Sequence, residues 1–332
     1  MKKSKAKSKM IIDRFILPVI DVAAVPFAII ASIVMKCFRE IERREMHMRL
    51  TKRIFLKVGV WPILDHYYEP LFQMKHLRHS LRDIRFLPGI DLREDAQVAL
   101  LKSFDYSKEL NKLPVDYPGA DGKFYFNNPS FGSGDSEILY SLIRKYKPSK
   151  IIEIGSGFST LMASEAIKQN RKELAAMGGY HCEQICIEPY EMPWLEKTSA
   201  TIIRERLEDV DKKIFRLLDE GDILFIDSSH MIRPQGDVLV EYLEILPQLK
   251  KGVLVHIHDV FTPRDYIDSW LYDRVRFWNE QYLMEAFLTC NDQYQVLLAV
   301  NYMTQDHFEL ISSRCPMLKE KRETGSFWIK RM

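Results

Sequence analysis

Two pairs of acidic and imidazole side chains stand at the ends of apolar runs. Asp227 ends one such run and lies three residues before His230, and His258-Asp259 ends a second run. An aspartate beside buried apolar residues is costly unless it binds a cation or a strong hydrogen-bond donor. Neighbouring parallel strands lie roughly 5 Å apart, so these side chains can converge on one ion or one hydroxyl group.

The chemistry of these residues leaves three readings open. The oxygens of Asp227 and Asp259 suit Mg²⁺, whereas the nitrogen of His258 suits Zn²⁺, Fe²⁺ or Mn²⁺, so a divalent ion is predicted without fixing its identity. His230, with an ordinary pKa of about 6.5, can take a proton from a hydroxyl group at neutral pH. The third reading is a hydrogen-bonded rim that only orders loops.

A glycine turn lies upstream. The apolar run from Lys150 enters Gly155-Ser156-Gly157 and a helical pattern follows, which predicts a strand, a tight turn and a helix whose free N–H groups face a ligand. Thr160 stands where a dinucleotide fingerprint has its third glycine. Glu188 ends the next predicted strand, where a carboxylate can accept hydrogen bonds from ribose hydroxyls.

Four segments, taken in order, resemble the strand ends of class I S-adenosylmethionine-dependent methyltransferases. They are Glu153-Ile-Gly-Ser-Gly157, Cys186-Ile-Glu-Pro-Tyr190, the segment 222–230 and the segment 253–259. The Asp-x-x-His and His-Asp endings are similar to the branch that includes macrocin-type sugar O-methyltransferases. The resemblance covers residues from about 126 to the end of the chain.

The resemblance implies S-adenosylmethionine as the cofactor and gives residues to it. Gly155, Ser156 and Gly157 would pass beside its methionine part, and Glu153 would bind its amino group through water. Adenine contacts are implied for the residues after the third strand, Arg206, Leu207 and Glu208.

The resemblance also implies roles at the other end of the site. Residues matching Asp227 and Asp259 hold Mg²⁺ in the macrocin-type branch, and the residue matching His230 is the general base. The present chain departs from that branch at His258, where the branch has a glutamate. The need for a metal and its identity therefore stay open.

Alternating strand and helix patterns predict an α/β fold, a doubly wound, seven-stranded and mainly parallel sheet with an N-terminal helical extension. The resemblance implies that the last strand runs antiparallel to the one before it. A glycine-rich loop before the first strand has two readings. It either closes over the site or only caps the next helix, with Asp135 or Ser133 as the N-cap. Strands are expected at 150–154, 183–188, 200–204, 222–227, 252–258, 294–300 and 326–330.

The chain is predicted to have three parts. Residues 1–39 form a basic and apolar N-terminal segment, 40–125 a helical and irregular cap, and 126–332 the S-adenosylmethionine-binding methyltransferase domain. Balanced charge, net +2, gives no indication of nucleic-acid binding. Five cysteines without a C-x-x-C pair argue against a disulfide framework and indicate a reducing compartment. Nothing in the sequence indicates the oligomeric state.

The N-terminal segment combines five lysines before residue 10 with a mostly apolar stretch from Phe15 to Met35. Pro18, Asp21 and Pro26 weaken a spanning helix, and basic residues at both ends place both ends in the cytoplasm. A re-entrant or interfacial helix, broken near Pro26, is predicted to contact the cytoplasmic face of a membrane through residues 11–39. The alternative is a buried helix that packs on the domain or on a second subunit.

The sequence thus predicts a cytoplasmic O-methyltransferase, peripheral or monotopic on a membrane. Its acceptor is expected to be a hydroxyl of a glycan, a lipid-linked sugar or a small metabolite. Two rivals are a non-catalytic scaffold that keeps the fold and a nicotinamide-dependent oxidoreductase. The missing third glycine counts against the oxidoreductase, and the presence of residues for both cofactor and acceptor counts against the scaffold.

Overall fold

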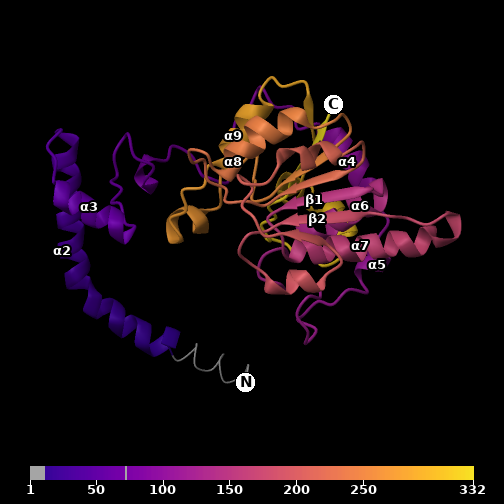
Figure 1. Ribbon diagram of the computed structural model, residues 1–332, viewed down its shortest axis with the longest axis horizontal. Helices are drawn as coiled ribbons and strands as arrows, with labels where there is room; N and C mark the ends of the chain where they lie inside the picture. Colours follow the sequence, from indigo (N-terminus) through magenta and orange to yellow (C-terminus); the bar gives the residue numbers. More distant parts are fainter. Residues whose placement is uncertain (1–11, 72) are drawn as a thin grey trace. The chain divides into compact units, whose positions relative to one another are not determined.

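The computed structural model describes residues 12–71 and 73–332 (Figure 1). The five lysines before residue 10 lie outside the described residues, as does residue 11 of the segment 11–39 that is predicted to contact a membrane. The chain divides into two compact units, one ending at Arg78 and the other running from His79 to Met332. The predicted domain boundaries, 39/40 and 125/126, remain predictions and do not coincide with this division.

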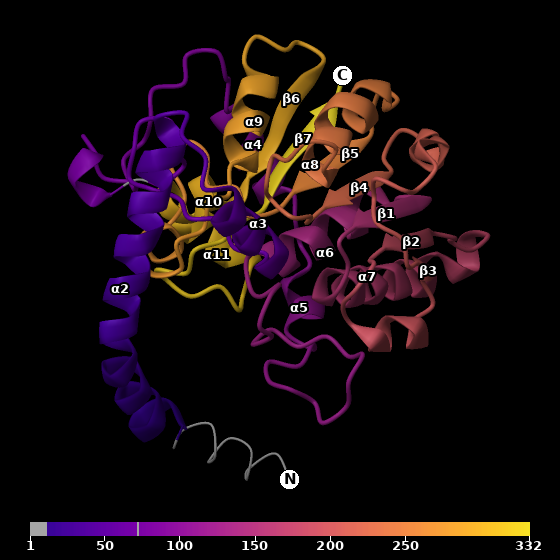
Figure 2. The same cartoon turned by 60° about the vertical axis from the view of Figure 1, so that its left-hand side comes forward.

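The C-terminal unit is built on one mixed sheet. Its strands lie in the order β3-β2-β1-β4-β5-β7-β6, which can be followed across Figure 2. Neighbours among β1 to β5 are parallel, and β7 is antiparallel to both β5 and β6. The predicted sheet, with its reversed last strand, is confirmed. The strands are β1 Lys150–Ile154, β2 Glu183–Ile187, β3 Thr201–Ile203, β4 Ile223–Ile226, β5 Leu254–Ile257, β6 Tyr294–Ala299 and β7 Phe327–Arg331.

Helices cover both faces of this sheet, because alternate strand residues point to opposite sides. Ile151 and Phe225 belong to one core with α4, α6, α7, α10 and α11, while Ile152 and Leu224 belong to a second core with α8 and α9. Almost continuous burial along β1 and β4 follows from this three-layer arrangement. The helices are α4 Glu94–Lys102, α5 Ser107–Leu110, α6 Asp135–Tyr146, α7 Phe158–Leu174, α8 Asp237–Val240, α9 Glu280–Leu288, α10 Val300–Asp306 and α11 Phe308–Arg314.

Helix α6 begins differently from the prediction. Its N-cap is Gly134, whose N–H donates to Glu137 Oε2 at 2.8 Å. Asp135 is already helical, and its Oδ1 accepts from the N–H groups of Gly325 and Ser326 at 3.0 and 2.8 Å. The predicted capping by Asp135 or Ser133 is wrong, because the carboxylate of Asp135 is engaged by the segment that leads into β7.

In the N-terminal unit, a short π-helical turn, Ile12–Ile16, leads into helix α2, Leu17–Arg43. Together they are long and apolar enough to cross a membrane, and their most apolar window has a mean hydropathy of 2.3 with no buried residue. The predicted break near Pro26 is wrong, because Pro26 lies inside α2. A proline costs a helix roughly 3 kcal/mol locally, which helical turns on both sides can offset. The alternative of a helix packed on the domain or on a second subunit remains a prediction.

The end of α2 has a small core of its own. Phe38 is buried, and its ring lies 5.0 Å from that of Phe55 in α3, Arg49–Val58, and 5.6 Å from that of Trp61. Arg39 forms an ion pair with Glu69. These contacts fix α3 against the last turns of α2.

The backbone of the turn after β1 packs directly against the backbone at the end of β4. Asp227 N–H donates to the carbonyl of Ile154 at 2.8 Å, and Gly155 has a positive φ of 75°. A Cβ on Gly155 would lie 1.8 Å from the carbonyl oxygen of Asp227. Only glycine fits this contact, which fixes the position of Asp227 relative to the turn.

Replacing Gly155 with alanine should therefore lower the free energy of unfolding by roughly 3 kcal/mol, the sum of left-handed backbone strain and overpacking. Gly119→Ala is the matched control, since Gly119 has φ +85° but nothing within 4 Å of an added Cβ. Urea unfolding of both variants measures the difference. Equal losses in the two variants would show that backbone strain alone, not the contact with Asp227, requires the glycine.

Candidate active site

A cavity of about 800 Å³ opens at the edge where the parallel strands end. Its volume lies in the usual range for small-molecule sites, and its position outside the carboxyl ends of the strands is where α/β sheets bind ligands. Pro129, Ser130 and Phe131 of the predicted closing loop also line it. The predicted site residues in its lining are Gly155, Ser156, Gly157, Glu188, Arg206, Leu207, Glu208, Asp227, His230, His258 and Asp259.

Glu188 is held rigidly at the end of β2. Its Oε2 accepts from Ser156 N–H at 3.2 Å, and its Oε1 accepts from the N–H groups of Tyr190 and Glu191 at 3.0 and 2.9 Å. A carboxylate has about four acceptor sites, so Oε2 retains one for a ligand hydroxyl. The carboxylate is thereby oriented before any ligand binds.

Glu153 does not line the cavity. It faces the helical layer and accepts from the hydroxyls of Ser159 and Thr160 and from the amide of Gln184, each at 2.8 to 2.9 Å. Burial raises the pKa of Glu153 to about 7 despite these donors. The side chain thus anchors the first turn of α7, and its predicted contact with the cofactor through water stays a prediction.

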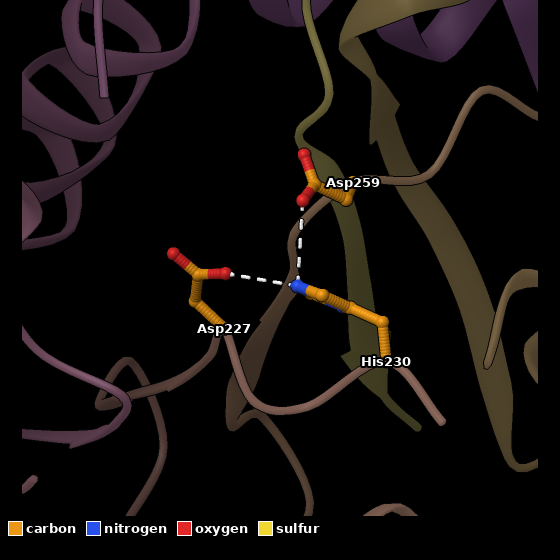
Figure 3. A group of neighbouring side chains, drawn as sticks. All are labelled: Asp227, His230 and Asp259. Atoms are coloured by element: carbon orange, nitrogen blue, oxygen red, sulfur yellow. Dashed lines mark ion pairs between the residues drawn. The ribbon is translucent and has the colours of Figure 1, made fainter. Parts of the chain in front are cut away.

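Asp227, His230 and Asp259 form a compact cluster at the other end of the cavity (Figure 3). His230 Nε2 lies 3.2 Å from Asp227 Oδ1 and 3.3 Å from Asp259 Oδ2. His230 Nδ1 lies 2.8 Å from Oε2 of the buried Glu280. Since Glu280 occupies Nδ1, Nε2 is the ring nitrogen that faces the cavity.

The backbone around this cluster is held in an unusual conformation. His230 and Asp259 both have positive φ values, 58° and 57°, which side chains other than glycine adopt rarely and mostly at functional sites. Asn279 N–H donates to the carbonyl of His230 at 3.1 Å. The N–H and the hydroxyl of Ser229 both donate hydrogen bonds to the carboxylate of Asp237. The start of α9 therefore fixes both the backbone and the ring of His230.

The carboxylates control the charge of the histidine. Burial alone would lower the pKa of His230, but hydrogen bonds to Asp227 and Glu280 and the charge of Asp259 outweigh it and raise that pKa well above its ordinary value. Burial also opposes the ionised form of Asp227, yet the positive charges of His258 and His230 hold the pKa of Asp227 below its usual range. The pKa of Asp259 is raised by burial.

The donor set fits a divalent cation. One ligand atom each from Asp227, His230 and Asp259 lie within 4.8 Å of one another, and two carboxylates with one imidazole suit Mg²⁺, Mn²⁺, Fe²⁺ or Zn²⁺. The predicted ligand His258 lies outside this cluster. Its Nε2 is 3.6 Å from Asp259, and its Nδ1 is buried without a hydrogen-bond partner among the described residues. As a metal ligand, His258 remains a prediction.

Glu280 is the site residue that sequence reasoning missed. It lies 50 positions after His230 and follows an aromatic-rich segment that looks like a lid. A histidine expected to act as a base needs an acceptor for its second nitrogen, and that requirement was the available signal. The sequence alone does not indicate which of the acidic residues after β5 is this acceptor.

The sheet has the order that the sequence resemblance implies. A seven-stranded sheet with a reversed β7, a glycine turn after β1 and an acidic residue after β2 are expected from the resemblance to class I S-adenosylmethionine-dependent methyltransferases. Residues 152–260 match a family described as a methyltransferase domain, and this range holds both ends of the cavity. Residues 152–260 are therefore similar to methyltransferase domains. The macrocin-type branch is not specifically supported.

Other similarities are more distant. An uncharacterized protein of Archaeoglobus fulgidus is 29% identical over 171 residues, covering 48% of this chain and 74% of that protein. An O-methyltransferase from Bacillus cereus in complex with S-adenosylhomocysteine is 11% identical, with a TM-score of 0.38 over 70% of this chain and 91% of that one. The O-methyltransferase TomG from Streptomyces achromogenes is 13% identical, with a TM-score of 0.34 over 70% and 89%. These two likenesses are too weak to support a function.

Replacing Glu280 with glutamine should lower the pKa of His230, because one of its three carboxylate neighbours loses its charge. NMR titration of the histidine ring protons measures this pKa. Glu244→Gln, at an exposed position of the preceding helical segment, is the control and should leave the pKa unchanged. An unchanged pKa in Glu280→Gln would show that Asp227 and Asp259 alone set the charge of His230.

The same variant should show a pH-dependent loss of stability. A folded-state pKa raised above the unfolded value of about 6.5 stabilises the fold below that pH, and the contribution disappears as the pH rises through the folded value. Glu280→Gln should thus lose unfolding free energy mainly below pH about 6.5, by roughly 1.4 kcal/mol for each pKa unit removed. Chemical unfolding at low and high pH tests the sign.

Proposed function

We propose that this protein transfers a methyl group from S-adenosylmethionine to a hydroxyl group of a glycan, a lipid-linked sugar or a small metabolite. The observation that carries the proposal is the position of His230 Nε2, which faces the cavity because Glu280 occupies Nδ1. A nitrogen so placed can take a proton from an acceptor beside the glycine turn.

The residues divide the reaction between two ends of the cavity. When bound, S-adenosylmethionine supplies an electrophilic methyl group on a positively charged sulfur. Glu188 and the turn Gly155-Ser156-Gly157 orient it, with Arg206, Leu207 and Glu208 beside the adenine. A cation held by Asp227 and Asp259 would offset the two charges that face Nε2 of His230 and favour its unprotonated form. Nε2 can then take the hydroxyl proton, and the charge of Glu280 stabilises the resulting imidazolium.

A divalent ion is part of the proposal. Asp227 and Asp259 would hold it, and a bound ion would lower the pKa of the acceptor hydroxyl and fix its direction. Nε2 of His230 cannot ligate an ion and accept a proton at the same time. We therefore assign His230 to proton transfer and leave the carboxylates to the ion.

Calorimetric titration with S-adenosylhomocysteine and, separately, with NADH should show micromolar binding of the first alone, with and without Mg²⁺. His230→Ala should keep this binding and reduce methyl transfer roughly 10²- to 10⁴-fold, the usual contribution of a positioned base. Transfer of labelled methyl groups to a panel of glycans and hydroxylated metabolites measures activity. His181→Ala, at an exposed position, is the control.

Each of the other outcomes would support one of the alternative interpretations. A folded protein that binds neither ligand would be a scaffold, and one that binds NADH alone would be an oxidoreductase. Loss of S-adenosylhomocysteine binding in His230→Ala, with no separate loss of turnover, would assign His230 to the hydrogen-bonded rim.

We also propose that α2 embeds in a membrane and holds the methyltransferase unit at the cytoplasmic face. Its apolar side chains are exposed on all sides of the helix, for example Leu17, Val19, Val25 and Phe27. Basic residues follow it, as the positive-inside rule requires of a cytoplasmic end. Helix α3 adds an exposed apolar stripe at four-residue spacing together with basic side chains, which suits an interfacial helix; the stripe is Leu50, Ile54 and Val58.

Carbonate extraction of membranes from cells that express the full-length chain tests this attachment. The wild type should stay in the membrane pellet. Val22→Asp combined with Ile30→Asp should release it, because each aspartate at the bilayer centre costs about 3 kcal/mol. Leu217→Asp, an exposed apolar position of the C-terminal unit, should stay in the pellet. Wild-type protein that is soluble without detergent would contradict the proposal.

A further inference from the structure

We infer that the acceptor carries an oxyanion, a phosphate or a carboxylate, next to the hydroxyl that is methylated, and that Arg274 and Arg276 bind this oxyanion. The inference rests on the methyl-transfer function proposed above and adds the chemical class of the acceptor. It follows from the charges in the cavity lining and from their partners.

Four arginines line the cavity, and they fall into two pairs. Arg206 is neutralised by Glu208, and Arg233 lies 3.6 Å from Asp237. Arg274 and Arg276 have no ion-pair partner among residues 12–71 and 73–332. The cavity lining therefore holds two positive charges that form no ion pair within the described residues.

Aromatic rings hold Arg276 in place. Its guanidinium carbon lies 4.6 Å from the ring centroid of Trp270 and 3.9 Å from that of Trp278. A guanidinium packed on ring faces keeps its in-plane N–H donors available, and these match the geometry of carboxylate and phosphate oxygens. Within the part of the chain that the structure describes, no side-chain hydrogen bond uses the donors of Arg274 or Arg276.

The two arginines are close enough to repel each other. Partial burial, and after it the positive charge of Arg274, lower the pKa of Arg276, while Asp259 opposes the shift. Two unneutralised like charges beside each other are unfavourable, and an oxyanion between them relieves the repulsion. Both arginines line the same cavity as Asp259 and His230.

Trp278 links the arginines to that cluster. Its ring contacts Arg276 and also lies 4.5 Å, between centroids, from the ring of His230. A ligand that lies along Trp278 can thus place an oxyanion at the arginines and a hydroxyl at His230. Aromatic faces of this kind suit the apolar face of a sugar ring, so a sugar phosphate or a sugar acid fits the arrangement.

The test uses the full-length protein saturated with S-adenosylhomocysteine and inorganic phosphate as the probe. Tryptophan fluorescence should change saturably on titration with phosphate, because Trp270 and Trp278 contact Arg276. Arg276→Gln and Arg274→Gln should each weaken phosphate binding about tenfold or more, the usual loss for a hydrogen bond to a charged group. Arg274 is exposed and does not stack on either tryptophan, so its replacement leaves the aromatic contacts of Arg276 in place. Arg216→Gln, at an exposed arginine outside the lining, should bind phosphate like the wild type.

Three further ligands identify the source of the oxyanion. Glucose 1-phosphate and an alkyl glucosyl phosphate should both bind more tightly than methyl glucoside, which has no phosphate. The ratio of the dissociation constants of the two phosphates then distinguishes a free sugar phosphate from a lipid-linked one as the preferred acceptor. The absence of a saturable phosphate response in protein that binds S-adenosylhomocysteine overturns the inference. So does equal binding by the wild type and both arginine variants. Failure to bind S-adenosylhomocysteine, by contrast, overturns the proposed function itself.

Discussion

The structure depends on the contact between the backbone of Gly155 and the carbonyl of Asp227. The turn that is proposed to bind the cofactor and the aspartate that is proposed to face the acceptor follow adjacent strands, β1 and β4, and this contact sets their separation. A side chain at Gly155 would push the two strand ends apart. Main-chain packing in the rigid sheet thus fixes the relative position of the two proposed ligand sites.

Charge balance is the second constraint. His230 is surrounded by carboxylates on both ring nitrogens, and the aspartate side faces the cavity whereas Glu280 is buried. The buried partner fixes the ring, and the two half-buried aspartates, which line the cavity, can meet an ion or a substrate. Because His230 and Asp259 are held at positive φ, the strain is stored next to the reacting groups and is offset by the hydrogen bonds of α9 and the sheet.

Much of this arrangement was predictable. Apolar runs that end in Asp227 and Asp259 placed both residues at one edge of a parallel sheet, and glycine spacing placed the turn beside them. Three features were not accessible. The partner of His230 comes from a distant helix, the carboxylate of Asp135 serves the segment before β7 instead of its own helix, and Pro26 does not break α2. Each depends on tertiary contacts or on the flanking turns, which local sequence patterns do not encode.

The place of β7 in the sheet has a consequence for how the chain folds during synthesis. β6 leaves the ribosome before β7, yet β7 lies between β5 and β6, so β6 has no partner in the sheet until β7 arrives. Until then, β5 presents an unpaired edge that can recruit other strands, and β6 remains a detached apolar segment. Asp135 is synthesised much earlier than β7. Its carboxylate accepts hydrogen bonds from the N–H groups of Gly325 and Ser326 once they are synthesised, and these bonds position β7 between β5 and β6.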